Sequence, residues 1–211
     1  MTLDLDLFRA TPLVRDPFDF LVVPGFVRHE ACEGINADYP EISKPGSFPV
    51  DEVTFGPKFA ELLADLDGGA MRAAFEEKFG LDLREKPSMT TVRGRCSERD
   101  GRIHTDSDTK IITVLIYLNS KWEQPGGQLR LLRSATDLED MIMEVPPIEG
   151  TLLAFRRCVN SFHGHKQFVG PRRVVQFNWV TNQNVVDRAM ARHRFAIWTK
   201  KIRSMFSSGA K

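Results

Sequence analysis

Histidine and aspartate stand two positions apart at His104 and Asp106, directly ahead of an apolar run that ends at Leu118. Imidazole and carboxylate groups are both good ligands for divalent transition metals. Residues two apart in an extended chain point to the same side, so these two side chains can reach one point. Asp108 is a competing carboxylate, but it lies past an expected turn. Two ligands do not hold a metal tightly, so a third ligand must come from elsewhere in the chain.

The candidates for the third ligand are His163 and His165, which stand in the sequence NSFHGHKQF between two expected strands. Both would face the same side of a continuing strand, so alternation leaves the choice between them open. The remaining histidines, His29 and His193, fall in segments with helical patterning. Two histidines and one carboxylate form the facial triad of non-haem Fe(II) oxygenases.

The surrounding sequence predicts the elements that position these residues. Residues 18–27 read as a strand ended by Pro-Gly, and residues 28–40 and 56–80 read as helices, the latter divided at Gly68-Gly69. Short apolar or alternating segments with turn signals between them follow at 89–92, 111–118, 128–132, 151–155 and 173–180. This pattern is typical of a β-barrel or a double-sheet jelly roll.

Composition limits the functional class. The net charge of +1 argues against a general nucleic-acid binder. The three cysteines form no close pair, which favours a reducing compartment. The acidic N-terminus does not resemble a signal peptide, and no apolar run is long enough to cross a membrane. We therefore expect a cytoplasmic protein without a transmembrane segment.

Residues 18–181 resemble the 2-oxoglutarate- and Fe(II)-dependent dioxygenases, specifically the prolyl 4-hydroxylase-like branch. The matching elements occur in the family's order: His-x-Asp, the strand end Tyr-Leu-Asn, a Gly-Gly hairpin, Gly-x-Leu-x-x-Phe, a distal histidine and an arginine about ten residues later. The resemblance implies an α+β fold with a double-stranded β-helix (jelly-roll) core, supporting N-terminal helices and a C-terminal helix. It also implies hydroxylation of an unactivated C–H bond with release of succinate and CO₂.

The resemblance implies Fe(II), 2-oxoglutarate and O₂ as cofactors, with ascorbate as an additional candidate. The implied iron ligands are His104, Asp106 and His163, since the family spacing favours His163 over His165. It also implies that Arg173 and Tyr117 hold the far carboxylate of 2-oxoglutarate. Strand alternation gives the same arginine, because Arg173 shares its face with Val175, Phe177 and Trp179, and this apolar face is expected to line the barrel.

The substrate is less well defined by the sequence. Where the family often has a tyrosine on the strand before His-x-Asp, this chain has Arg93, followed by Arg95, Arg99 and Arg102. We consider Arg93, Arg95 and Arg102 as substrate-binding candidates that would favour an anionic substrate, with solvated loop arginines as the alternative. The substrate is expected to be a peptidyl residue such as proline, or an amino acid. The alternatives are a small metabolite, glycan or lipid precursor, and, outside the family, a zinc hydrolase or a non-catalytic barrel that binds a metal or ligand.

Domain organisation completes the predictions. We expect one dioxygenase domain over residues 1–182, with an N-terminal strand and helices at 1–86 and the jelly-roll core at 87–182. Residues 183–211 are expected to form a basic helix. From Val185 onward this segment carries seven Lys or Arg residues against Asp187 alone, and its apolar positions indicate packing against the barrel or in a homo-oligomer. Binding to an acidic partner or an anionic membrane is the alternative.

Overall fold

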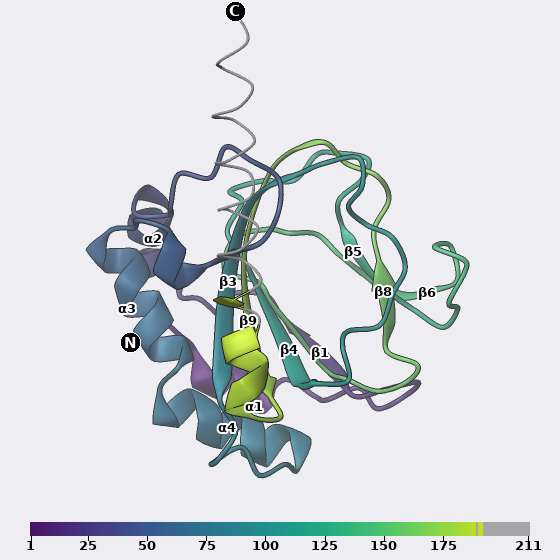
Figure 1. The fold of residues 1–211 in the computed structure, drawn as a ribbon, viewed down its shortest axis with the longest axis horizontal. Helices are drawn as coiled ribbons and strands as arrows, with labels where there is room; N and C mark the ends of the chain where they lie inside the picture. The colour runs from purple at the N-terminus through teal and green to yellow at the C-terminus, as the bar shows by residue number, and fades with distance from the viewer. Residues whose placement is uncertain (189, 192–211) are drawn as a thin grey trace, which may run out of the picture.

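The computed structural model describes residues 1–188, 190 and 191, and its centre is a pair of antiparallel sheets facing each other (Figure 1). The major sheet has the strand order β1-β7-β4-β9-β3-β2 and the minor sheet the order β6-β5-β8. The strands are β1 (Phe20–Val23), β2 (Phe48–Pro49), β3 (Ser88–Cys96), β4 (Lys110–Tyr117), β5 (Leu129–Leu132), β6 (Met141–Val145), β7 (Leu152–Arg156), β8 (Phe162–Gly164) and β9 (Gly170–Val180).

The helices lie on the side of the major sheet that faces away from the minor sheet (Figure 1). They are α1 (Leu5–Ala10), α2 (His29–Ala37), α3 (Pro57–Leu66) and α4 (Gly69–Phe79), with a short 3₁₀ turn η1 (Val50–Glu52) between α2 and α3. Pro57 occupies the first turn of α3, where its missing N–H costs nothing. Gly80 ends α4 in the left-handed conformation with φ 64°, which a glycine adopts without strain.

Strand alternation gives the major sheet two apolar faces. On β4 and β9, Ile112, Val114, Val175 and Phe177 belong to the core that the helices cover, together with Trp179 at the end of β9. The intervening positions face the minor sheet, where a smaller cluster forms from Phe18, Phe20, Leu115, Tyr117, Leu129, Leu131, Val145, Leu153, Phe155 and Val174. The larger core therefore lies between helices and sheet, and the smaller one lies inside the jelly roll.

The predicted jelly-roll fold is confirmed, and so are the strands around 111–118, 128–132, 151–155 and 173–180. The division between α3 and α4 at Gly68-Gly69 is also confirmed. The sequence did not predict α1, β2, β6 or β8. The last three are short or exposed strands, so their periodicity is weak. The N-terminal segment contributes β1 and β2 to the major sheet, paired with β7 and β3.

The predicted basic C-terminal helix falls mainly outside the described residues. Residues 183–188 are helical, as are 190 and 191.

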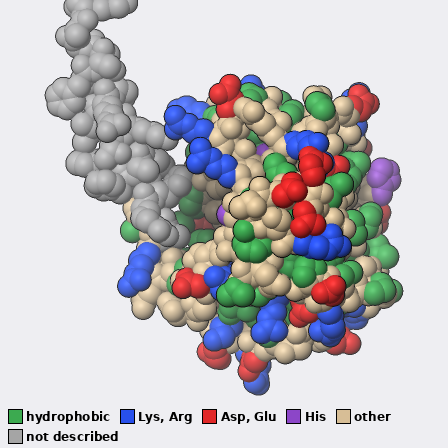
Figure 2. Space-filling view, turned by 90° about the vertical axis from the view of Figure 1, so that its right-hand side faces the viewer, with side chains coloured by type: hydrophobic (Ala, Val, Ile, Leu, Met, Phe, Trp, Pro, Cys, Tyr) green, Lys and Arg blue, Asp and Glu red, His purple; other side chains and the backbone are tan. Residues whose placement is uncertain are grey.

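In the part of the chain that the structure describes, no helix is both long and apolar enough to span a membrane. On the face over the minor sheet, acidic and basic side chains are interspersed (Figure 2).

Candidate metal centre

His104, Asp106 and His163 come together at one end of the cavity between the sheets. One ligand atom from each residue lies within 4.8 Å of those of the other two. His104 and His163 form an isolated antiparallel bridge, with backbone hydrogen bonds of 3.0 and 2.9 Å in the two directions. Their rings lie 4.3 Å apart between centroids. The backbone pairing thus fixes the two imidazoles beside each other.

Both imidazoles are oriented to leave one nitrogen free. Nδ1 of His104 donates to the carbonyl oxygen of Arg102 at 2.9 Å, and Nδ1 of His163 donates to that of Ser161 at 3.0 Å. A carbonyl can only accept, so Nδ1 carries the proton and Nε2 keeps its lone pair. Burial lowers the pKa of His163 to about 4, so this ring is neutral near pH 7. Both imidazoles therefore present an unprotonated Nε2 that can bind a metal ion.

The carboxylate of Asp106 is ionised and held on both oxygens. Lys110 Nζ donates to Oδ1 at 2.8 Å, and the Thr113 hydroxyl donates to Oδ2. Burial alone would raise the pKa of Asp106, but the positive Lys110, the neighbouring His163 and these hydrogen bonds outweigh it and lower that pKa. The two histidines and this anion fit a divalent metal such as Fe(II) in both charge and donor type. Lys110 and Thr113 orient the carboxylate, as residues behind metal ligands commonly do.

The two competing residues of the sequence analysis lie outside this cluster. His165 lines the same cavity, but its Nδ1 contacts the carbonyl of Lys166 at 2.8 Å and it is not within reach of the other ligands. Asp108 is exposed and accepts from the Ser107 hydroxyl. The grouping of His163 with Asp106 agrees with the ligand set that we expected.

The cavity behind the triad has a volume of about 320 Å³, and Arg172 of β9 lies in its lining, next to Tyr117 of β4. The Arg172 side chain is buried, and its guanidinium carbon lies 5.4 Å from the centre of the Tyr117 ring. Nε of Arg172 donates to the Gly127 carbonyl at 2.8 Å. Among the described residues, however, neither Arg172 Nη2 nor the Tyr117 hydroxyl has a hydrogen-bond partner.

Two unpartnered polar atoms beside each other are expensive unless a ligand satisfies them. Burial raises the pKa of Tyr117 to about 12, against the lowering effect of the positive Arg172, so the hydroxyl remains a donor. A guanidinium fork and a hydroxyl donor together match a carboxylate. The part of the cavity that Arg172 lines is thus suited to the far carboxylate of a dicarboxylate such as 2-oxoglutarate.

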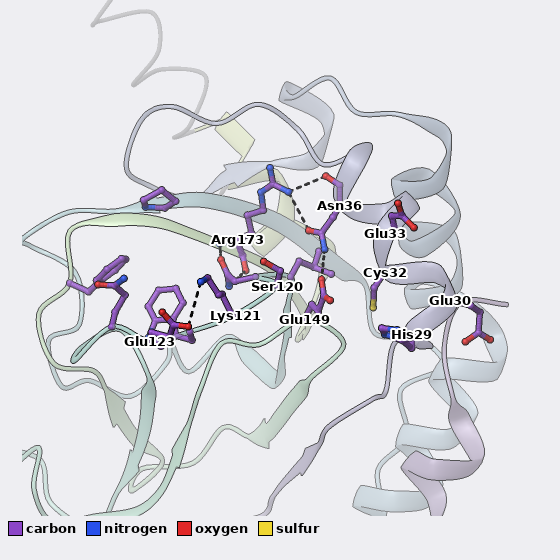
Figure 3. A pocket seen from close by; sticks show the side chains of 16 residues that line it. His29, Glu30, Cys32, Glu33, Asn36, Ser120, Lys121, Glu123, Glu149 and Arg173 are labelled. Atoms are coloured by element: carbon purple, nitrogen blue, oxygen red, sulfur yellow. Dashed lines mark hydrogen bonds and ion pairs between the residues drawn. The ribbon is translucent and has the colours of Figure 1, made fainter.

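The expectation that Arg173 faces this cavity was wrong. Its guanidinium lies on the helix side of the sheet, where Nη1 donates to the Asn36 carbonyl and side-chain oxygens at 3.0 and 3.2 Å (Figure 3). It also lies 5.1 Å from the centre of the Tyr39 ring. Asn36 in turn donates to Glu149 at 2.8 Å. Arg173, Asn36 and Glu149 line a separate groove beside α2, which shares none of the residues that line the triad cavity.

The error came from the choice of face. We assigned the more apolar face of β9 to the barrel interior, but Val175, Phe177 and Trp179 pack against the helices. The interior face carries Arg172, Val174 and Gln176, because the interior is a cavity for polar ligands as well as a core. The face of β9 with polar residues, and not the apolar face, should have been assigned to the metal site. That choice would have given Arg172.

The arginines proposed for substrate binding separate into two groups. Arg93 and Arg102 line the triad cavity, and Arg99 does so as well. Arg95 does not; it lines a small neighbouring cavity with Cys96 and Ser97, which Arg99 also borders. Arg93 is paired with Asp100 at 2.7 Å and also donates to Ser47. The placement of Arg95 therefore contradicts its assignment to the substrate site, and Arg99 was missing from that assignment.

Comparison with known proteins agrees with the geometry. Residues 93–181 match the family model described as the 2OG-Fe(II) oxygenase superfamily. This range contains all three residues of the triad and both Tyr117 and Arg172. None of the curated proteins compared with the chain matches it.

Several solved structures share the fold. A Pseudomonas putida prolyl-4-hydroxylase superposes with a TM-score of 0.50 at 19% identity, over 87% of this chain and 98% of that one. The viral collagen prolyl hydroxylase of Paramecium bursaria Chlorella virus-1, solved with 2OG, gives 0.53 at 16% identity, over 80% and 99%. A 2OG-Fe(II) oxygenase-family oxidoreductase from Burkholderia pseudomallei gives 0.51 at 14%, over 76% and 84%.

Proposed function

We propose that the chain is a 2-oxoglutarate-dependent dioxygenase of the 2OG-Fe(II) oxygenase superfamily, whose family model matches residues 93–181, and we assign its residues to the parts of the reaction. His104, Asp106 and His163 bind Fe(II) on one side, and Arg172 with Tyr117 binds the far carboxylate of 2-oxoglutarate. The observation that carries this assignment is that the buried Arg172 lines the triad cavity with Nη2 unpartnered among the described residues, beside the unpartnered hydroxyl of Tyr117.

Iron, O₂ and 2-oxoglutarate supply the oxidation of a substrate C–H bond to an alcohol, with 2-oxoglutarate converted to succinate and CO₂. The protein residues bind and orient. His104, Asp106 and His163 would hold Fe(II) with three protein ligands, which would leave coordination positions for the co-substrate and O₂. Arg172 and Tyr117 fix the depth of the co-substrate, and thereby the placement of its reacting end at the triad. Phe155, Leu115 and Leu129 line the cavity and exclude water from it.

Hydroxylation of a peptidyl residue or an amino acid is the reaction we propose. Two of the structures that share the fold are prolyl hydroxylases, one of them described as a collagen prolyl hydroxylase. Proline in a peptide is therefore the first substrate to test. A small metabolite remains the second candidate, because a cavity of about 320 Å³ also admits small molecules.

Anaerobic titration tests the cofactor site. Fe(II) followed by 2-oxoglutarate is expected to produce a weak visible charge-transfer band, and O₂ is then expected to yield succinate. Neighbouring residues provide matched controls: Asp106→Ala and His163→Ala should abolish the band, whereas Asp108→Ala and His165→Ala should retain it. Absence of both band and succinate in the wild-type protein would refute the function. Loss of the band in His165→Ala alone would refute the ligand set.

A further inference from the structure

The mouth of the triad cavity carries more positive charge than the cofactors require. Five cationic side chains line the cavity, against the two carboxylates of Asp100 and Asp106. The cations are Arg93, Arg99, Arg102, Lys110 and Arg172. Bound Fe(II) adds two positive charges and 2-oxoglutarate adds two negative ones, so these cofactors leave the excess of three positive charges unchanged.

Three of the five cations already have a role. Lys110 is paired with Asp106 at 2.8 Å, and Arg93 with Asp100 at 2.7 Å. Arg172 is assigned to the co-substrate. Arg99 and Arg102 are exposed, and neither makes a side-chain ion pair or hydrogen bond with any of the described residues. They are the two cations at this site that remain for another ligand.

The loop that bears these two arginines is fixed in place. Asp100 accepts hydrogen bonds from the backbone N–H and hydroxyl of Ser97, and from Arg93. The next residue, Gly101, has φ 92° and its carbonyl accepts from the His165 backbone at 3.0 Å. A Cβ at Gly101 would lie 2.4 Å from the His165 carbonyl oxygen, so only glycine fits this close approach.

Arg99 and Arg102 thus flank two residues that are anchored to the cavity wall. Solvated loop arginines have no need of such an anchor, whereas a binding site gains affinity when its backbone is ordered before the ligand arrives. Both arginines line the same cavity as the triad, so a substrate that reaches the metal centre is exposed to their charge.

We propose that the substrate of this site carries an anionic group, a carboxylate or a phosphate, which Arg99 and Arg102 bind at the mouth of the triad cavity. This inference rests on the proposed function, because it places the anion beside bound 2-oxoglutarate. Arginine suits both anions, since its planar fork can donate two parallel hydrogen bonds to either. The positive loop would also discriminate against cationic substrates.

Paramagnetic relaxation tests the site without knowledge of the substrate. Limiting Mn(II) is bound to excess metal-free protein, 2-oxoglutarate is added to saturation, and inorganic phosphate or ¹³C-acetate is titrated. A bound anion near the metal shows enhanced ³¹P or ¹³C relaxation. We expect saturable enhancement by at least one of the two anions, and the stronger one identifies the preferred chemistry.

Variants locate the anion. Arg99→Gln/Arg102→Gln should bind the anion about ten-fold more weakly, because two charge-assisted hydrogen bonds are lost. Arg95→Gln is the control, since it removes a nearby arginine that does not line the triad cavity, and its affinity should stay within about two-fold. The protein's own Mn(II) and 2-oxoglutarate binding is checked in each variant by the EPR signal of free Mn(II) and its change on co-substrate addition.

Three outcomes would overturn the inference. Absence of saturable enhancement means that no anion site exists. Enhancement that disappears when 2-oxoglutarate is added means that the anion occupied the co-substrate position. Enhancement that persists in the double variant means that the anion binds the metal directly. Failure of Mn(II) or 2-oxoglutarate to bind the wild-type protein is a different result, which would refute the proposed function first.

Discussion

Arg172 and Arg173 are adjacent on β9, but their side chains lie on opposite sides of the major sheet. Arg173 is satisfied by Asn36 and by the Tyr39 ring, within a network that joins α2 to the sheet. Arg172 is buried and keeps Nη2 without a partner among the described residues. Of these two arginines, the one on the helix side is thus paired by protein groups, whereas the one on the barrel side keeps a donor for a ligand.

The same contrast holds along the rest of the strand. Val175, Phe177 and Trp179 on the helix side are part of the main core. Val174 and Gln176 on the barrel side line the triad cavity. One face of β9 therefore contributes to the stability of the fold, and the other contributes to the ligand site. Substitutions on the helix side should mainly change the free energy of unfolding, and those on the barrel side should mainly change ligand binding.

The largest expected effect is on stability, at Trp179. Its ring packs 4.9 Å from Phe75 and 4.7 Å from Phe177 between centroids. Trp179→Ala should lower the free energy of unfolding by about 3–5 kcal/mol, because it leaves a large cavity. Gln176→Ala, on the other face, should change it by less than about 1 kcal/mol. Chemical denaturation measures both, and equal losses would remove the distinction between the faces.

The two tyrosines of the chain sharpen the comparison. Tyr117→Phe removes a hydroxyl that is reserved for the co-substrate, so 2-oxoglutarate should bind about ten-fold more weakly with little change in stability. The Tyr39 hydroxyl donates to the carbonyls of Arg93 and Val174 at 2.9 and 3.1 Å.

Tyr39→Phe is therefore the matched control. It should lower the free energy of unfolding by about 1–2 kcal/mol and leave the affinity for 2-oxoglutarate within about two-fold. Isothermal titration with Mn(II)-loaded protein and thermal denaturation provide the two readouts. If Tyr117→Phe has unchanged affinity for 2-oxoglutarate, its hydroxyl does not contact the co-substrate.

A pH dependence of stability is expected from His163. Its pKa is lowered by burial to about 4 from 6.5, so in metal-free protein the unfolded chain takes up this proton first as the pH falls. The free energy of unfolding should therefore decrease from pH 6.5 to pH 4, by at most about 1.4 kcal/mol per pH unit from this group.

Chemical denaturation in the presence of a chelator at pH 7 and pH 5 measures that slope. His163→Gln removes the titrating group, so its slope should be shallower than that of the wild-type protein. Equal slopes would mean that another group carries the pH dependence.

The comparison of the two faces also explains what the sequence could predict. His104 and Asp106 were identifiable because their types and spacing are specific, and the strands beside them because their apolar runs are long. Alternation correctly separated Arg172 from Arg173, but it cannot tell which face is inside. That depends on what packs against the sheet, and α1–α4 lie far from β9 in sequence.

Other features depended on contacts that have no local pattern. Lys110 stands only four positions after Asp106, but it reads as an ordinary charged residue, and the sequence does not show that the two side chains pair. Arg99 and Arg95 are equivalent in the sequence, and only the path of the loop places Arg99 in the cavity. The residue types thus predicted the chemistry of the site. Where several residues of one type stand close together in the sequence, only the tertiary structure shows which of them lies in the site.

The affinity of 2-oxoglutarate for Arg172→Gln and Arg173→Gln tests the central claim most directly. Anaerobic titration of the Fe(II)-loaded variants, followed through the visible charge-transfer band, gives the dissociation constant for each. We expect Arg172→Gln to bind at least about 30-fold more weakly than the wild-type protein, since a buried charge-assisted contact is lost. Arg173→Gln should bind within about two-fold of the wild-type protein. The reverse order would show that Arg173 holds the co-substrate and would contradict the assignment of the two faces.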